Sequence, residues 1–124
     1  MDKALSFLGL SRRAGKLLTG EDGVSGAARS GDAALLMTAC DTADNTRKKT
    51  VNLSEWYKIQ YVALPWDKDT LGELLDKRVC AIMALTDKGL AAAFLEKLAA
   101  AYPEYEPAAE AFRAGRTAKR RQRQ

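Results

Sequence analysis

The sequence predicts an α/β fold, a three-layer α/β/α sandwich with a small mixed sheet of about four strands. Two observations lead to this fold class. Segments with helical spacing alternate along the chain with short strand-like segments, and two of the strand-like segments are apolar throughout. A strand that is apolar on both faces has to be covered on both, so helices are expected on either side of the sheet. At 124 residues, the chain has enough mass for one such core.

The first third of the chain is expected to hold two helices and two strands. Residues 3–14 place apolar side chains close to helical spacing, with cations near the C-terminal end, where they suit the helix dipole. Residues 16–19 then form a short strand. Residues 21–30 begin with two acidic residues and end before Gly31, as a helix does. The apolar run at 33–40 (AALLMTAC) has the length and character of a covered strand.

The middle of the chain continues this alternation. A helix is expected to end near residue 58, and four polar residues are candidates for its N-cap: Asp41, Thr42, Asp44 and Asn45. Residues 59–64 form the next strand, and Pro65 ends it. A short helix follows at 70–76, with Asp67 or Asp69 as its cap.

The last predicted strand is the second fully apolar run, at 79–85 (VCAIMAL). Residues 88–102 form the clearest helix, because their apolar side chains fall on one stripe. Pro103 and Pro107 interrupt the pattern, and residues 108–114 extend it as a weak helix.

Positive charge is concentrated at the C-terminus. The last twelve positions contain no acidic residue and six of the 20 basic ones: Arg113, Arg116, Lys119, Arg120, Arg121 and Arg123. The rest of the chain has 14 basic and 16 acidic residues. We therefore expect a folded domain at residues 1–102 and a flexible basic tail at 103–124. Such a tail binds polyphosphate electrostatically, without choosing a sequence.

Composition excludes several classes of protein. No apolar run approaches the roughly 18 residues that span a bilayer, and the N-terminus lacks a signal-peptide cleavage site, so a cytoplasmic protein with no membrane partner is expected. Cys40 and Cys80 lie in apolar runs and are expected to be buried thiols. Because the chain has no His, a zinc site would need all its ligands from two thiols and carboxylates, and none is expected. We also expect no other metal and no cofactor.

The sequence does not match an enzyme. Residues 9–16 (GLSRRAGK) have five residues between the glycines where a phosphate loop has four, and Leu17 replaces its Ser or Thr. No His is available as a general base, and no Ser stands in a nucleophile elbow. Three acidic residues are explained as helix caps: Asp41, Asp44 and Asp87. We therefore expect no catalysis and no small-molecule substrate.

Eight of the 14 basic residues outside the tail form three groups. Arg12, Arg13 and Lys16 precede one predicted strand, and Lys77 with Arg78 precedes another. The run at 47–49 lies on a predicted helix. A solvated charged face explains each group as well as phosphate contact does, and the sequence alone leaves both interpretations open.

Three segments together carry a resemblance to a known family: FLGLSRRAGKLLTGED, ARSGDAALLMTACDTADNTRKK and LGELLDKRVCAIMALTDKGLAAAFLEKL. They resemble the bacterial YlxQ-type proteins of the ribosomal "L-seven-Ae" kink-turn RNA-binding superfamily, over about residues 3 to 98. The resemblance implies the same α/β/α sandwich and binding to RNA, typically a kink-turn, which is a sharply bent internal loop with tandem sheared G·A pairs. The implied partners are ribosomal or other structured RNA, and ribosomal proteins.

The resemblance also implies where RNA binds. One segment is the loop and helix start after the first strand, with the candidate residues Thr19, Gly20, Glu21, Asp22, Gly23 and Gly26. The other is the loop before the last strand, with Lys77, Arg78 and Val79. Further phosphate contacts are expected from Arg12, Arg13 and Lys16, provided that they face the same side. A helix N-terminus presents free N–H groups to phosphate, and polar side chains there can read exposed purine edges.

The chain departs from the kink-turn binders at three of these positions. Asp22 stands where they have Asn, Gly23 where they have Glu or Gln, and Gly26 where they have Lys. Asp lacks the amide donors of Asn, and glycine has no side chain. The leading prediction is a non-catalytic RNA-binding protein, associated with the ribosome or with structured RNA. The alternative is a protein-interaction module on the same fold that has lost the specific RNA site, and a small α/β enzyme comes third.

Overall fold

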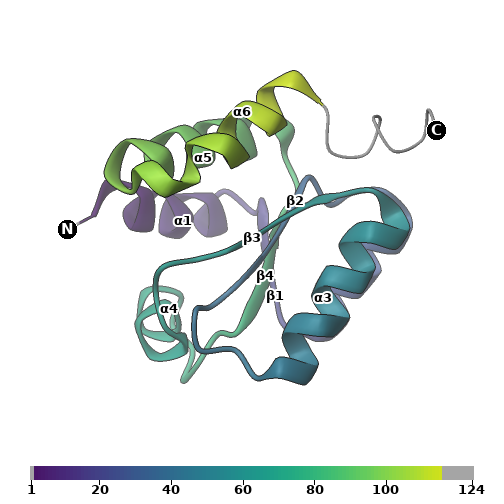
Figure 1. Cartoon of the computed structure of the whole chain (residues 1–124). Coiled ribbons are helices and arrows are strands. Elements are labelled where there is room, and N and C mark those ends of the chain that lie inside the picture. Colours follow the sequence, from purple (N-terminus) through teal and green to yellow (C-terminus); the bar gives the residue numbers. More distant parts are fainter. Residues whose placement is uncertain (1, 116–124) are drawn as a thin grey trace.

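The computed structural model describes residues 2–115 as a sheet held between two layers of helices (Figure 1). In chain order the elements are α1 (Lys3–Arg13), β1 (Leu17–Thr19), α2 (Glu21–Ser30), β2 (Leu35–Thr38), α3 (Asp44–Tyr57), β3 (Gln60–Ala63), α4 (Lys68–Leu74), β4 (Ile82–Leu85), α5 (Lys88–Ala101), the 3-10 helix η1 (Pro103–Tyr105) and α6 (Glu106–Ala114). The predicted alternation of helices and strands is confirmed.

Within the described residues, the sheet has four strands in the order β1-β4-β2-β3. Strand β4 is antiparallel to both of its neighbours, and its Leu85 lies opposite Leu17 of β1 and Leu35 of β2. Strands β2 and β3 are parallel, with Leu35 opposite Gln60, and α3 makes the crossover that a parallel pair requires. The predicted small mixed sheet is confirmed.

Helices cover both faces of the sheet because the central strands send apolar side chains to both. Met37 of β2 and Met83 of β4 belong to a core cluster with α1, α4, α5 and α6. On the opposite face, Leu36 and Ile82 pack with Val24 of α2 and with α3. In Figure 1, α1, α5 and α6 lie together above the sheet, and α3 lies below it. The predicted three-layer sandwich is confirmed.

Two of the predicted helix caps are also confirmed. The side chain of Asp67 accepts a hydrogen bond from the backbone N–H of Thr70 at 2.8 Å, and this bond lowers the pKa of the Asp67 carboxyl. Helix α4 consequently begins two residues earlier than predicted. The side chain of Asp87 accepts from the N–H of Leu90 at 2.9 Å, at the start of α5. Because this bond makes Asp87 a helix cap, its position at the end of a strand does not call for a catalytic role.

The predicted cap of α3 is wrong. Its N-cap position is Ala43, and no side chain in the described part of the chain caps the helix. Thr42 instead donates its hydroxyl to the carbonyl of Ala39 at 2.7 Å, and Asp41 accepts from the N–H of Lys68 at 2.9 Å. The other two candidates lie inside the helix. The polar side chains of Thr42 and Asp41, which the sequence pattern assigned to the cap of α3, therefore bond to the preceding loop and to α4 instead.

The packed body continues beyond residue 102, where the sequence analysis placed the start of the tail. Ala109 of α6 is buried, and Gln60 Nε2 of β3 donates to the carbonyl of Ala108 at 2.8 Å. The hydroxyl of Tyr105 donates to the carbonyl of Ala63, also in β3. Because β3 is an edge strand, these contacts place η1 and α6 over that edge. The expected weak helix at 108–114 is thus part of α6.

Candidate nucleic-acid interface

The sheet brings the two candidate loops to the same end of the molecule. Because β1 and β4 are antiparallel, the end of β1 lies beside the start of β4, and Thr19 pairs with Met83. The N–H of Gly20 continues the pairing by donating to the carbonyl of Ile82 at 3.1 Å. Segment 19–26, which follows β1, and segment 76–79, which leads into β4, are therefore attached at the same end of the sheet. We call these two segments the loop surface.

Gly20 sets the geometry of the first segment. Its φ of +87° and ψ of 157° lie in a region that only glycine adopts without strain. This conformation turns the chain from β1 into α2, where the N–H of Val24 donates to the carbonyl of Gly20 at 3.0 Å. No described side chain caps α2, so the N–H groups of its first turn point out of the helix end and favour an anion.

Packing does not require glycine at the two other glycine candidates. A Cβ on Gly23 would lie 3.8 Å from Leu18, which is ordinary contact, and one on Gly26 would meet no described atom within 4 Å. A β-carbon would therefore fit on α2 at both positions. In the chain as it stands, the exposed side chains of this segment are the acidic ones of Glu21 and Asp22.

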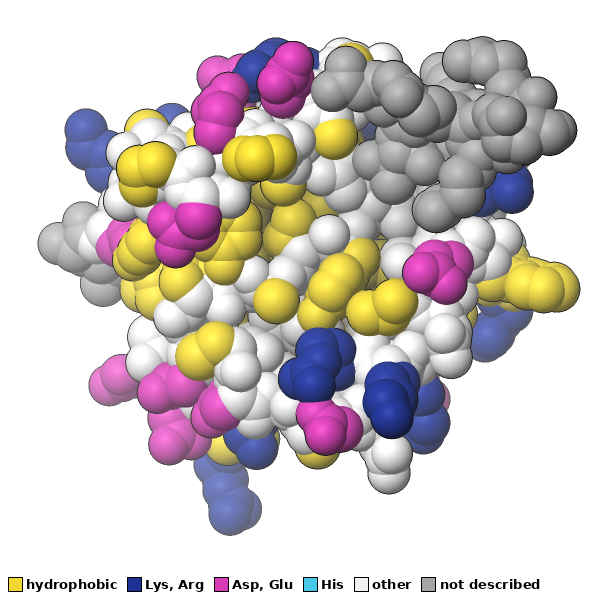
Figure 2. Space-filling model, viewed as in Figure 1, with side chains coloured by type: hydrophobic (Ala, Val, Ile, Leu, Met, Phe, Trp, Pro, Cys, Tyr) yellow, Lys and Arg dark blue, Asp and Glu magenta, His cyan; other side chains and the backbone are white. Residues whose placement is uncertain are grey.

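A cation of α3 lies next to this acidic segment. The Nζ of Lys49 is 4.0 Å from the Oε1 of Glu21, and both side chains are more than half exposed. Such a pair stabilises the fold little, but it places positive charge beside the start of α2. Figure 2 shows that, on the face in view, Lys and Arg side chains gather mainly over α3, and Asp and Glu side chains around α4 and over α5 and α6. Sequence reasoning did not include Lys49 among the site residues.

The second segment is fixed by a close approach to α4. The N–H of Lys77 donates to the carbonyl of Gly72 at 2.7 Å, and a Cβ on Gly72 would lie 2.7 Å from the carbonyl oxygen of Arg78. Asp76 enters the loop with a φ of +61°. Lys77 and Arg78 are exposed, and so is Val79, at 52%. The loop is therefore anchored by its backbone and projects its side chains into solvent.

The three cations near the end of α1 are not all brought to the loop surface. Burial raises the pKa of the Cys80 thiol, and the charges of Lys77 and Arg12 oppose that rise. Arg13 is exposed at the last position of α1. The carbonyl of Lys16 accepts from the N–H of Thr86 at 2.9 Å, which places Lys16 at the opposite end of β1. Of the three, Arg12 is the one whose charge acts on the same thiol as the charge of Lys77.

One cation of the expected tail forms ion pairs with the folded domain. Arg113 lies in α6, and its guanidinium is 3.0 Å from the carboxylate of Glu96 and 3.3 Å from that of Glu106. These hydrogen bonds raise the pKa of Arg113. The other five tail cations lie outside the described residues. Their role in binding stays a prediction.

One cysteine was placed wrongly. Cys80 is buried, but Cys40 is exposed, because β2 ends at Thr38 and Cys40 lies in the loop that follows. Both thiols are free. Among residues 2–115, no group of three or more Cys, Asp or Glu side chains is arranged to hold a metal ion. No helix in that part of the chain is long and apolar enough to cross a membrane.

The amino-acid sequence matches a known family over most of its length. The model of the Ribosomal protein L7Ae/L30e/S12e/Gadd45 family matches residues 2–94. The chain is 34% identical to the RNA-binding protein YlxQ of Bacillus subtilis (strain 168) over 85 residues, which are 68% of this chain and 84% of that protein. It is 39% identical to the RNA-binding protein YlxQ of Enterococcus faecium over 57 residues, 46% of this chain and about half (55%) of that protein.

Solved structures share the fold. A protein with unknown function from Bacillus halodurans C superposes with a TM-score of 0.73 at 28% identity, over 79% of this chain and 98% of that one. The Giardia lamblia 15.5kD RNA binding protein superposes with a TM-score of 0.62 at 17% identity, over 77% of this chain and 84% of that one, a likeness that concerns the fold alone.

The family match takes in every element from α1 to β4 and all twelve candidate residues of the body. The family is non-enzymatic, which agrees with the expectation from the sequence. The resemblance noted in the sequence is confirmed: the chain belongs to the Ribosomal protein L7Ae/L30e/S12e/Gadd45 family.

Proposed function

We propose that this chain binds structured RNA through the loop surface and carries out no chemistry on it. The observation that carries the proposal is the antiparallel pairing of β1 with β4, which sets the uncapped start of α2 beside the anchored loop at 76–79. A helix N-terminus and a cationic loop at one end of a sheet form a surface for a phosphate backbone. The relatives named as RNA-binding proteins support the same conclusion.

The proposed RNA is a kink-turn or a similarly bent internal loop of ribosomal RNA, and the chain would bind it in the cytoplasm. A fixed loop and a fixed helix end suit an RNA whose backbone is already bent, because neither partner then has to reorganise. Lys77 and Arg78 would contact phosphates of one strand, and the first turn of α2 would face the other. Arg12 and Lys49 would add positive charge at the rim, and the cations after Gly115 would add affinity of a general kind.

Charge reversal of the anchored loop tests this proposal. Lys77→Glu with Arg78→Glu should weaken binding of the full chain to a kink-turn RNA about tenfold or more and make the salt dependence shallower by about 1.5 in log–log slope, because two phosphate contacts are lost. The matched control is Lys3→Glu with Lys88→Glu. Both residues are exposed at the first positions of helices, where a carboxylate is tolerated.

Equal affinities for the loop variant and the control, across a salt series, would refute a role for the anchored loop. Equal weakening of both variants would mean that net charge alone governs binding. In the second case, the loop surface would have no preference over other cationic parts of the protein.

A second candidate function follows from the glycines of α2. Gly23 and Gly26 present no side chain to a ligand, although a β-carbon would fit at both, and Asp22 repels phosphate. These features favour a module that binds a ribosomal or assembly protein by the same surface. Copurification of a protein partner after nuclease treatment, with loss of all RNA affinity when residues 116–124 are removed, would establish this alternative.

A further inference from the structure

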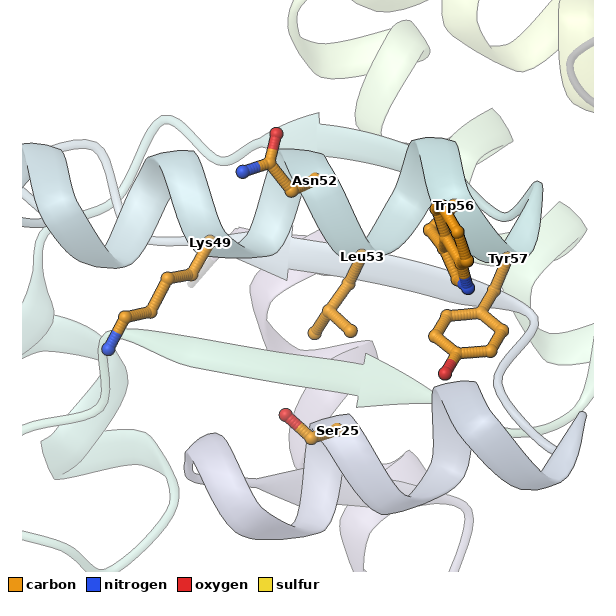
Figure 3. A pocket seen from close by; sticks show the side chains of 6 residues that line it. All are labelled: Ser25, Lys49, Asn52, Leu53, Trp56 and Tyr57. Carbon is orange, nitrogen blue, oxygen red and sulfur yellow. The ribbon is translucent and has the colours of Figure 1, made fainter.

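A groove runs between α2 and α3, outside the loop surface for most of its length. It has a volume of about 460 Å³ and is lined by Ser25, Lys49, Asn52, Leu53, Trp56 and Tyr57. Figure 3 shows Lys49, Leu53 and Tyr57 extending from α3 toward α2, with Ser25 facing them from α2. The α3 residues at 49, 52, 53 and 56 have the spacing of a single helical stripe. The groove is therefore a continuous feature of the packed helix pair.

The most exposed large apolar residue of the described chain lies in this groove. Trp56 is 78% exposed, whereas the other tryptophan, Trp66, is 9% exposed and packs against Phe94 and Tyr102, with ring centroids 6.4 and 6.0 Å away. Trp66 belongs to the core, and Trp56 contributes almost nothing to it. An exposed indole on a rigid helix is a flat surface on which a second flat ring can stack.

The polar groups of the groove suit a nucleotide. The six lining residues that the structure describes include an amide, two hydroxyls and a cation but no acidic side chain. Lys48 precedes Asn52 by one helical turn, and Ser25 has Arg29 one turn after it and Glu21 one turn before it, so two further cations and one carboxylate lie on the helices beside the groove. An aromatic surface flanked by cations binds unpaired nucleotides, because bases stack on the ring and phosphates meet the charges.

The groove is also joined to the loop surface. Lys49 lines the groove and at the same time lies 4.0 Å from Glu21, which belongs to the loop surface. A strand of RNA leaving the start of α2 would therefore pass Lys49 and reach Trp56 along a single helical stripe. This continuity favours RNA over an unrelated protein as the occupant.

We propose that the α2–α3 groove binds one or two unpaired nucleotides next to the structured RNA, with a base stacked on Trp56 and a phosphate near Lys49. The proposal rests on the proposed function, since it extends the same RNA beyond the loop surface. It assigns to α3 a contact with single-stranded RNA that is separate from recognition of the bent element.

The test measures binding of the full chain to three kink-turn RNAs: one that is blunt, one with four unpaired nucleotides at its 5′ end and one with four at its 3′ end. The better extension should tighten binding about tenfold, at the lower end of what base–aromatic stacking provides. Trp56→Ala should remove that gain and leave the affinity for the blunt RNA unchanged, and Trp56→Phe should keep most of it. Leu10→Ala, which truncates a 54% exposed apolar residue on α1, serves as the matched control and should change neither affinity.

Fluorescence gives an independent readout. Because Trp66 is buried, quenching by the extended RNA should come from Trp56 and be absent from Trp56→Ala. Equal wild-type affinity for blunt and extended RNA would overturn the proposal. So would equal weakening of both RNAs by Trp56→Ala. Loss of a copurifying protein on Trp56→Ala, with the gain from the extension intact, would assign the groove to a protein partner instead.

Failure of the proposed function would give a different result. The blunt kink-turn RNA would then bind no better than a plain duplex. In that case, the groove is tested by titrating the full chain with a free single-stranded oligonucleotide and measuring tryptophan fluorescence. Quenching that depends on Trp56 would uphold the groove as a nucleotide site, and its absence would refute it.

Discussion

Gly72 offers the sharpest single test of how the fold positions the loop surface. A Cβ at this position would lie 2.7 Å from the carbonyl oxygen of Arg78 and 2.8 Å from that of Lys77. The shorter distance is about 0.7 Å below the 3.4 Å at which ordinary contact begins. Because the obstructing atoms are backbone, Gly72→Ala has to displace the loop, and the 2.7 Å hydrogen bond from the Lys77 N–H to the Gly72 carbonyl would be strained.

The magnitude follows from three contributions. Overpacking costs about 1–3 kcal/mol, and a weakened backbone hydrogen bond costs about 1 kcal/mol. Alanine recovers about 1 kcal/mol of helix propensity within α4. The net loss in the free energy of unfolding is therefore about 2 kcal/mol. At about 4 °C per kcal/mol for a domain of this size, Tm should fall by roughly 8 °C.

Thermal unfolding followed by circular dichroism measures this change, and RNA binding at a temperature where both proteins are folded measures its consequence. We expect Gly72→Ala to weaken binding as well, because Lys77 and Arg78 leave their positions. Wild-type stability together with wild-type RNA affinity would refute the claim that Gly72 holds the loop. Reduced stability with unchanged affinity would refute the assignment of RNA binding to that loop.

Four further predictions follow from the same structure. Gly26→Ala should raise the free energy of unfolding by about 1 kcal/mol in denaturant titrations, because its Cβ meets no described atom and alanine favours a helix; a loss of stability would contradict the open space there. Asp22→Asn combined with Gly26→Lys should strengthen kink-turn binding in a filter or calorimetric assay, because donors replace a repelling carboxylate and a cation is added; unchanged affinity would argue that α2 does not face the RNA. Burial raises the pKa of Tyr105 to about 12 from an ordinary value of 10.0, so its stabilising contribution is complete below pH 10 and is lost as the pH rises toward 12. Tyr105→Phe should flatten part of that decline in unfolding experiments, and an identical slope in both proteins would contradict the assignment. Ending the chain after residue 102 should lower Tm, whereas ending it after residue 115 should not, since α6 packs on the body; equal Tm values would restore a domain boundary at 102.

Local signals predicted most of the fold. Helix α2 begins and ends at the predicted residues, because an acidic first turn and Gly31, which has a φ of +85°, mark its ends within the sequence itself. The apolar runs located β2 and β4, although each strand is shorter than its run. The cap of α3 failed for the opposite reason. Besides the carbonyl of Ala39, the Thr42 hydroxyl also reaches the distant carbonyl of Ala81 at 3.1 Å, and Asp41 accepts from Lys68, and no local pattern indicates these distant partners.

Some features of the candidate site were likewise predicted from the sequence, and others depend on the tertiary structure. Family motifs located the two loops, but their proximity depends on the register of β1 against β4, which composition does not determine. Lys16 was grouped with Arg12 by sequence distance, and the strand between Lys16 and Gly20 separates it from the loop surface. Lys49 and Trp56 were missed as site residues because their significance depends on the packing of α2 against α3. The sequence did contain one signal that could have indicated these residues, a tryptophan on the same predicted helix as the basic run at 47–49.

The most direct measurement of the central claim is the RNA preference of the chain ending at Gly115, which keeps every described helix and strand. This protein and the full chain would each be titrated with a kink-turn RNA and with a plain duplex of equal length, at two salt concentrations. The loop surface should give the shortened chain a preference for the kink-turn at both salt concentrations, with the residues after 115 adding salt-sensitive affinity for both RNAs. No preference in the shortened chain, with binding restored by those residues alone, would contradict the account.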